Sequence, residues 1–253
     1  MSARRRRPLV RVLPLVLLLP LAACGGDGTG DGSQGELTVL AAASLTDVFE
    51  ELATPFEDEH DVDVTFNVGA STELAASVAD GAPGDVLATA DEASMAVAED
   101  AGVTGEVEVF ATNVLTIVVP PGNPSRIESL DDLAGTTWVR CADEVPCGKV
   151  ALAVLDAHGV RAEPVSLEED VRDTLDKVVT GEADAGLVYA TDAVAAGDEV
   201  EAVAISGAED HPTSYVAATL EQSDDADLAA EWVAWVTSEE GQAILGDAGF
   251  GRP

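Results

Sequence analysis

Small polar residues stand at the start of several expected helices, and each of these helices follows an expected strand or extended segment. The first turn of a helix has unpaired backbone N–H groups and a partial positive charge. If several such helix starts converged, they would bind an anion without any Lys or Arg. The positions are Ser44, Ser71, Cys147-Gly148 and Asp170-Val171.

The same residues have a second interpretation as ordinary helix caps. Ser and Asp are preferred N-cap residues, and each of Ser44, Ser71 and Asp170 taken singly fits a cap better than a ligand contact. Their joint occurrence favours a binding site, because ligands of open α/β folds bind outside the carboxyl ends of the strands. The residues alone leave both interpretations open and name no ligand.

Enzyme motifs are missing from the sequence. It has no His-Glu-x-x-His, no Gly-x-Ser-x-Gly, no P-loop and no dinucleotide fingerprint. The histidines, His60, His158 and His211, are scattered and suit surface or turn positions. With 48 Asp and Glu, paired carboxylates arise by chance. We therefore expect a protein that is not an enzyme and has no cofactor.

Short β-type runs alternate with Ala-rich amphipathic stretches along the chain. The expected elements of the first half are 37–40, 45–60, 62–67, 72–79 and 85–89, in the order βαβαβ, then a helix at 91–101 and a long β-branched strand at 113–119. Those of the second half are 130–133, 137–140, 148–158, 164–165, 171–180, 185–189, 214–219 and 226–236. Trp232 and Trp235 lie at helical spacing and are expected in the core. The pattern predicts an α/β fold of one large domain or two small ones.

The N-terminus has the features of an export signal. Arg4 to Arg7 and Arg11 precede an apolar run, Val12 to Leu21, which is too short and too broken by proline for a spanning helix. Leu-Ala-Ala-Cys, ending at Cys24, resembles the bacterial lipobox. This resemblance implies a signal over 1–23 and lipidation of Cys24. The alternative is an ordinary signal with an incidental cysteine. Residues 24–35 are mostly Gly, Asp and Ser and are expected to be a flexible tether.

The chain is strongly acidic. Five of its 12 basic residues lie in 1–23, which has no acid, so the remainder has 7 basic against 48 acidic residues and a formal charge of −41. Nucleic acid and anionic membrane surfaces are therefore unsuitable partners. The same field repels an anionic ligand at long range, so an anion site must rely on local donors.

Cys141 and Cys147 are the cysteines that remain after Cys24. In an exported protein they could form a disulfide if their Cα atoms come within about 7 Å. Two free buried thiols or a metal pair are the alternatives, although no His or third Cys lies nearby to complete a zinc site.

Several stretches, in this order, resemble the molybdate-binding proteins of ABC importers. They are Ala41-Ala42-Ala43-Ser44-Leu45, Asn67-Val68-Gly69-Ala70-Ser71, Gly84-Asp85-Val86, Val145-Pro146-Cys147-Gly148, Glu169-Asp170-Val171-Arg172 and Gly186-Leu187-Val188-Tyr189-Ala190-Thr191-Asp192-Ala193. This family often has alanine in place of Cys147 and glycine in place of Thr72. A backbone donor at Cys147 is indifferent to the first change, and the second puts the local turn in doubt.

The resemblance implies a two-lobed class II periplasmic-binding-protein fold. Each lobe would be a mixed sheet flanked by helices, with lobe 1 at 36–114 plus 217–253, lobe 2 at 115–216, and two hinge strands at 113–119 and 214–218. Ser44 and Ser71 would donate from lobe 1. Cys147 and Val171 would donate backbone N–H groups and Tyr189 its phenol from lobe 2.

The implied function is capture of molybdate or tungstate and its delivery to the transmembrane subunits of an ABC permease. The protein would be a monomer, exported and anchored to the outer face of the cell membrane by lipid. Molybdenum would be held only through its oxyanion, with no direct protein–metal ligands. The rivals are the same fold binding sulfate, phosphate or a small organic anion, an exported serine hydrolase using Ser44 or Ser71, and a surface adhesin.

Overall fold

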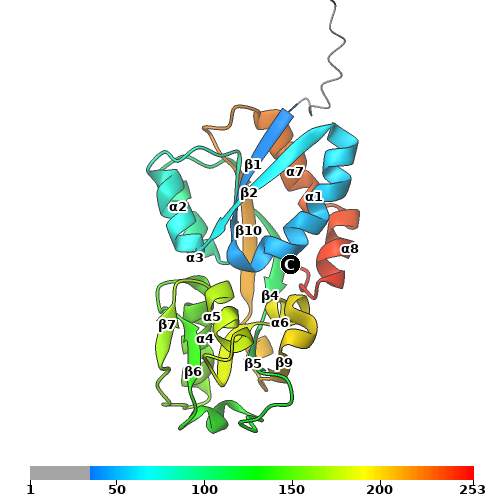
Figure 1. The fold of residues 1–253 in the computed structure, drawn as a ribbon. Coiled ribbons are helices and arrows are strands. Elements are labelled where there is room, and N and C mark those ends of the chain that lie inside the picture. Colours follow the sequence, from blue (N-terminus) through cyan, green and yellow to red (C-terminus); the bar gives the residue numbers. More distant parts are fainter. Residues whose placement is uncertain (1–34) are drawn as a thin grey trace, which may run out of the picture. The chain divides into compact units, whose positions relative to one another are not determined.

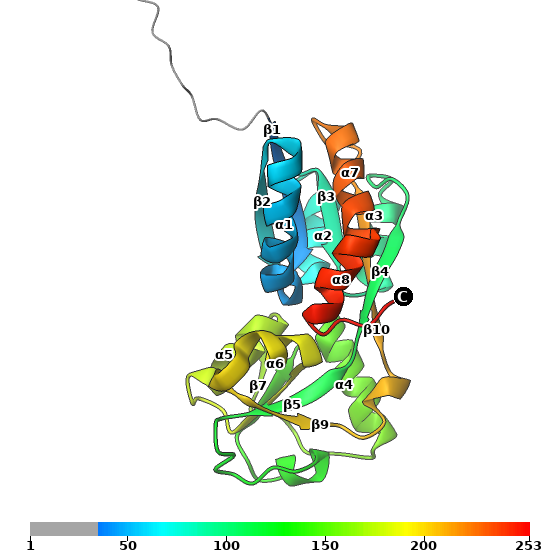
Figure 2. The same ribbon diagram turned by 90° about the vertical axis from the view of Figure 1, so that its right-hand side faces the viewer.

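Two five-stranded sheets, each flanked by helices, form two lobes in the computed structural model, which describes residues 35–253 (Figures 1 and 2). The expected signal at 1–23, the expected lipidation at Cys24 and the expected tether up to residue 34 lie outside the described residues. Among the residues that are described, no helix has both the length and the apolar character that crossing a membrane requires.

The first lobe contains a sheet with the strand order β2-β1-β3-β10-β4. Strand β1 is parallel to β2 and β3, whereas β10 is antiparallel to β3 and β4, so the sheet is mixed. Its strands are β1 (Gly35–Ala42), β2 (Val62–Gly69), β3 (Val86–Thr89), β4 (Glu108–Asn113) and β10 (Thr213–Thr219). Its helices are η1 (Ala43–Leu45), α1 (Thr46–His60), α2 (Ser71–Ala79), α3 (Glu92–Asp100), α7 (Ala226–Thr237) and α8 (Glu239–Asp247).

Hydrophobic clusters lie on both faces of this sheet at β1, where successive side chains point to opposite faces. Val39 of β1 joins the core cluster that includes Phe49 and Trp232 of α1 and α7. The next residue, Leu40, joins a second cluster with α2 and α3. Trp232 is fully buried, as predicted, whereas Trp235 is only partly buried and donates its Nε1–H to the Leu52 carbonyl at 3.0 Å.

The second lobe contains a sheet with the strand order β7-β6-β8-β5-β9. Strand β6 is parallel to β7 and β8, and β5 is antiparallel to β8 and β9. Its strands are β5 (Leu115–Val119), β6 (Trp138–Cys141), β7 (Ser166–Glu168), β8 (Ala185–Tyr189) and β9 (Glu201–Ala204). Its helices are η2 (Leu130–Leu133), α4 (Pro146–Ala157), α5 (Val171–Val179), α6 (Ala190–Ala196), η3 (Gly197–Glu199) and η4 (Ala208–Asp210).

The chain passes between the lobes in the middle of a run that we expected to be one strand. The run 113–119 is divided at Val114, with Asn113 ending β4 in the first sheet and Leu115 beginning β5 in the second. The return falls before Thr213, since all of β10 pairs in the first sheet. Residues 213–216, expected in lobe 2, thus belong to the first sheet. A run that is mostly β-branched cannot reveal a change of sheet, because the same residues suit strands of either sheet.

Candidate functional site

The residues that line a cavity between the lobes lie at or just after the carboxyl ends of six strands. Strands β1, β2 and β3 contribute from the first lobe and β6, β7 and β8 from the second, and in each lobe these three strands are parallel to one another. Parallel strands end at the same edge of a sheet, so the segments that follow them meet there. The lining residues are Ala42, Ala43, Ser44, Gly69, Ala70, Ser71, Ala90, Val145, Pro146, Cys147, Asp170, Val171 and Tyr189.

The structure brings all five expected ligand-binding residues to this cavity. Ser44 and Ser71 reach it from the first lobe, and Cys147, Val171 and Tyr189 from the second. Ala90, which sequence reasoning did not single out, also lines it. It follows β3 directly, and its N–H donates to Ser71 Oγ at 3.0 Å. The position of Ala90 directly after a strand could have indicated a site residue. Alanine has no polar side chain, however, so the sequence analysis did not select it.

The two serines are not helix caps. Ala70 is the N-cap of α2 and Leu45 that of α1, and neither makes a side-chain cap bond. The hydroxyl of Ser71 accepts the Ala90 N–H, which leaves its own proton for another acceptor. Ser44 Oγ shares a 2.8 Å hydrogen bond with Tyr215 Oη. For these serines the capping interpretation is therefore wrong.

Asp170, in contrast, is a true N-cap. Its Oδ1 accepts the N–H groups of Arg172 and Asp173 at 2.7 and 3.0 Å. These are the second and third N–H groups of α5, so the N–H of Val171, the first residue of the helix, remains uncapped. The Asp170 cap therefore satisfies the N–H groups of Arg172 and Asp173 and leaves the Val171 N–H, at the cavity, without a cap bond.

Helix α4 begins with a proline, so its first backbone N–H belongs to the second residue of the helix. Pro146 occupies the first helical position, where its missing N–H costs nothing, so Cys147 supplies the first donor of the helix. The first bond within the helix is from Lys149 N–H to Val145 O, at 3.0 Å. A Cβ on Gly148 would lie 1.7 Å from the Ala142 carbonyl oxygen, so only glycine lets this turn approach the preceding loop so closely.

Cys141 and Cys147 are joined by a disulfide in the structure, with their Cα atoms 5.8 Å apart. Cys141 ends β6 and Cys147 lies in the first turn of α4. The bridge therefore ties a residue that lines the cavity to the sheet of its own lobe.

Tyr189 ends β8 with its side chain buried, and its phenol oxygen makes no hydrogen bond of ordinary geometry with the described residues. The Thr213 hydroxyl, which slightly lowers the pKa of this phenol, donates to the Ala90 carbonyl. Burial raises the pKa of this phenol well above its ordinary value, so the group is a neutral donor at physiological pH. A buried polar group without a partner costs about 1–3 kcal/mol. Tyr189 is among the residues that line the cavity.

Polar residues behind the cavity connect its two halves. Asn113 Nδ2 donates to Thr191 Oγ1 at 2.8 Å and to Tyr215 Oη at 3.4 Å, and Tyr215 in turn bonds Ser44. These groups come from β4, α6 and β10, and sequence reasoning missed them. An Asn or Tyr within an expected strand carries no signal of such a role.

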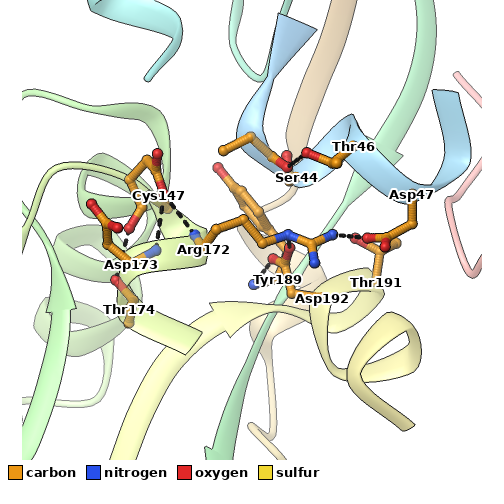
Figure 3. A network of polar contacts seen from close by, with 12 residues as sticks. Ser44, Thr46, Asp47, Cys147, Arg172, Asp173, Thr174, Tyr189, Thr191 and Asp192 are labelled. Atoms are coloured by element: carbon orange, nitrogen blue, oxygen red, sulfur yellow. Dashed lines mark hydrogen bonds and ion pairs between the residues drawn. The ribbon is translucent and has the colours of Figure 1, made fainter. Parts of the chain in front are cut away.

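Two ion pairs join the lobes beside the cavity. Lys149 Nζ lies 2.8 Å from Asp91 Oδ2. The Arg172 guanidinium pairs with the Asp47 carboxylate, as Figure 3 shows. Arg172 Nε also lies 3.2 Å from Oδ1 of the fully buried Asp192. Both cations are thus neutralised by carboxylates, and no Lys or Arg is among the residues that line the cavity.

Comparison with known proteins identifies the family. A model of bacterial extracellular solute-binding proteins matches residues 37–251. The chain is 38% identical over 248 residues to the molybdate-binding protein ModA of Mycobacterium tuberculosis, a match that covers 94% of this chain and 95% of that protein.

Solved structures share the fold. The periplasmic molybdate-binding protein of Azotobacter vinelandii aligns with a TM-score of 0.71 at 20% identity, over 86% of this chain and 99% of that one. The sulfate-binding protein SubI of Mycobacterium tuberculosis aligns with a TM-score of 0.75 at 22% identity, over 85% and 86% of the two chains. The chain therefore belongs to the bacterial extracellular solute-binding proteins, in the family that includes the molybdate-binding proteins named ModA.

Proposed function

We propose that this protein captures molybdate or tungstate outside the cell membrane, between its two lobes, and delivers it to an ABC permease. No reaction takes place. Ser44 and Ser71 donate from the first lobe, and Tyr189 together with the N–H groups of Cys147 and Val171 donates from the second. The identity with ModA proteins over nearly the whole chain supports this assignment.

The observation that carries the proposal is the buried hydroxyl of Tyr189. It makes no hydrogen bond of ordinary geometry with the described residues, and Tyr189 lines a cavity together with Ser44, Ser71 and the uncapped helix starts at Cys147 and Val171. A tetrahedral oxyanion has four acceptor oxygens, and such a set of neutral donors matches it. A basic or apolar ligand would leave these donors unsatisfied.

The size and charge of the cavity suit a small anion. The cavity has a volume of about 20 Å³, whereas sites for drug-sized ligands span about 300–1,000 Å³. Because no cation lines it, the unliganded site has no buried positive charge to desolvate. Cavity dimensions must then distinguish molybdate from sulfate, since both are tetrahedral dianions.

We further propose that Cys24 anchors the exported protein to the outer face of the membrane through lipid. The support is the Leu-Ala-Ala-Cys site after a basic and apolar leader. Intact mass of the membrane-extracted protein tests this, and an unmodified Cys24 or a mature terminus elsewhere would reject it.

Calorimetric titration with molybdate, tungstate, sulfate and phosphate tests the function. We expect tight one-to-one binding of molybdate and tungstate, and weaker binding of sulfate and phosphate. A protein that binds sulfate or phosphate more tightly than both metal oxyanions would be another transporter of the same fold. A protein that binds none of the four would contradict the proposal.

A serine-reactive phosphonate tests the hydrolase alternative. Such an enzyme needs a base beside its nucleophile. Ser44 is bonded to Tyr215 and Ser71 to the Ala90 N–H, and within residues 35–253 neither hydroxyl is hydrogen-bonded to a histidine. We therefore expect no labelling of either serine.

A further inference from the structure

Arg172 lies where the two halves of the proposed oxyanion site meet. It directly follows Val171 in α5, and it pairs across the lobes with Asp47, three residues after Ser44. Figure 3 shows its guanidinium between the carboxylates of Asp47 and Asp192. One side chain thus joins two segments that each carry a proposed ligand donor.

Asp192 holds this guanidinium within the second lobe. The Asp192 carboxylate is fully buried, accepts the Tyr189 N–H on Oδ2 at 3.0 Å, and lies 3.2 Å from Arg172 Nε through Oδ1. Both contacts lie inside the second lobe, so they persist whether the lobes are together or apart. The contact of Arg172 with Asp47, in contrast, exists only when the lobes meet.

The geometry points to Arg172 as a positioning residue that locks the closed site. Held by Asp192, it pairs with Asp47 when Ser44 comes opposite Tyr189 and Val171, and it thereby slows ligand release. Arg172 is not among the residues that line the cavity. This inference rests on the proposed function, since it assigns a role in the same site.

The lock and simple electrostatics predict opposite results for Asp47→Asn. Removing a carboxylate near a site for a dianion reduces repulsion and on that ground alone would tighten binding. Removing the partner of Arg172 weakens the closed state and speeds release. Half-exposed ion pairs are worth up to about 1 kcal/mol, so we expect roughly three- to fivefold faster dissociation of molybdate.

Glu51→Gln is the matched control. Glu51 lies one helical turn after Asp47 in α1, is exposed, and lines the same groove as Asp47 and Arg172. Its substitution removes the same charge from nearly the same place, while the Asp47–Arg172 pair remains. We expect molybdate dissociation to be unchanged or slightly slower in this variant.

Stopped-flow chase of bound molybdate with excess tungstate measures dissociation in the parent and both variants. Faster release in Asp47→Asn only supports the lock. Unchanged or slower release in Asp47→Asn, or equal acceleration in both variants, would overturn it. Arg172→Gln combined with Asp47→Asn should release no faster than Arg172→Gln alone, because the pair is already lost.

Small-angle scattering of the unliganded proteins separates this inference from the proposed function. The lock predicts a larger radius of gyration for Asp47→Asn than for the parent and Glu51→Gln. If the parent failed to bind any of the four anions, the proposed function would fall, and scattering would still decide whether the pair closes the lobes. Equal radii in all three proteins would overturn the lock.

Discussion

Individual side chains are expected to contribute unequally to the proposed site, and both proposed serine donors also form hydrogen bonds within the protein. Ser44→Ala and Ser71→Ala each remove a hydroxyl that would donate to a charged oxygen, a bond worth about 1.5–3 kcal/mol. We expect the molybdate affinity to fall roughly ten- to a hundredfold in each variant by calorimetry. Val171→Ala keeps its backbone donor and is the control. Affinity unchanged in both serine variants would contradict the assigned roles.

Tyr189→Phe should separate binding from stability. The hydroxyl that it removes is buried and unpaired, so the unliganded variant should be at least as stable as the parent in urea unfolding. Its molybdate affinity should nevertheless fall, by less than in the serine variants. A clear loss of stability without ligand would mean that the hydroxyl has a protein partner, and the observation that carries the proposed function would be lost.

The buried carboxyl of Asp192 links stability to pH. Burial, opposed by Arg172 and the Tyr189 N–H, raises the pKa of this group to about 7, whereas an unfolded Asp titrates near about 3.9. Between these values the folded protein binds a proton that the unfolded chain lacks, so this group lowers the stability as pH rises towards 7.

Asp192→Asn cannot ionise and should remove this dependence. The difference in free energy of unfolding, variant minus parent, is therefore expected to become more positive from pH 5 to pH 8. Urea unfolding at several pH values measures it. A difference independent of pH would show that the carboxyl does not titrate in this range.

At the scale of elements, the disulfide between β6 and α4 holds the helix start that presents the Cys147 N–H. Replacing both cysteines with serine should lower the free energy of unfolding by about 2 kcal/mol, since the closed loop is short. Molybdate affinity should fall only slightly, because the backbone donor is retained. Two alkylatable thiols in the non-reduced, denatured parent would contradict the disulfide.

At the scale of the whole molecule, a strongly acidic protein must admit a dianion. Residues 24–253 have a formal charge of −41, and Lys149 and Arg172 beside the cavity are already paired with carboxylates. Long-range repulsion should therefore slow association, and salt should relieve it, because the Debye length falls from about 30 Å at 0.01 M to about 8 Å at 0.15 M.

We expect the association rate of molybdate to rise about two- to fivefold over this range of salt, as judged by stopped flow. Repeating the series with chloride and acetate salts controls for competition at the site. A rate that falls with added salt in both series would mean that cations steer the ligand, contrary to a site of neutral donors.

Local chemistry in the sequence was enough to predict much of the site. Helix starts after strands pointed to Ser44, Ser71, Cys147 and Val171, because strand order and donor type can be recognised within a few residues. The family resemblance alone added Tyr189, and the structure brings all five residues to one cavity. Resemblance also predicted two lobes with mixed sheets, which the structure has. The short spacing and the exported setting favoured a disulfide between Cys141 and Cys147 over free thiols or a metal pair, and the structure has this disulfide.

Only the tertiary structure decided how these parts face one another. Three features depend on which strands are neighbours and how the lobes meet. They are the division of 113–119 between two sheets, the hydrogen bond between Ser44 and Tyr215, and the pairing of Asp47 with Arg172. Hydrophobic periodicity reports whether a residue is buried, whereas it does not report what the residue is buried against. The proposed donors could therefore be predicted from the sequence, whereas the contacts that orient them could not.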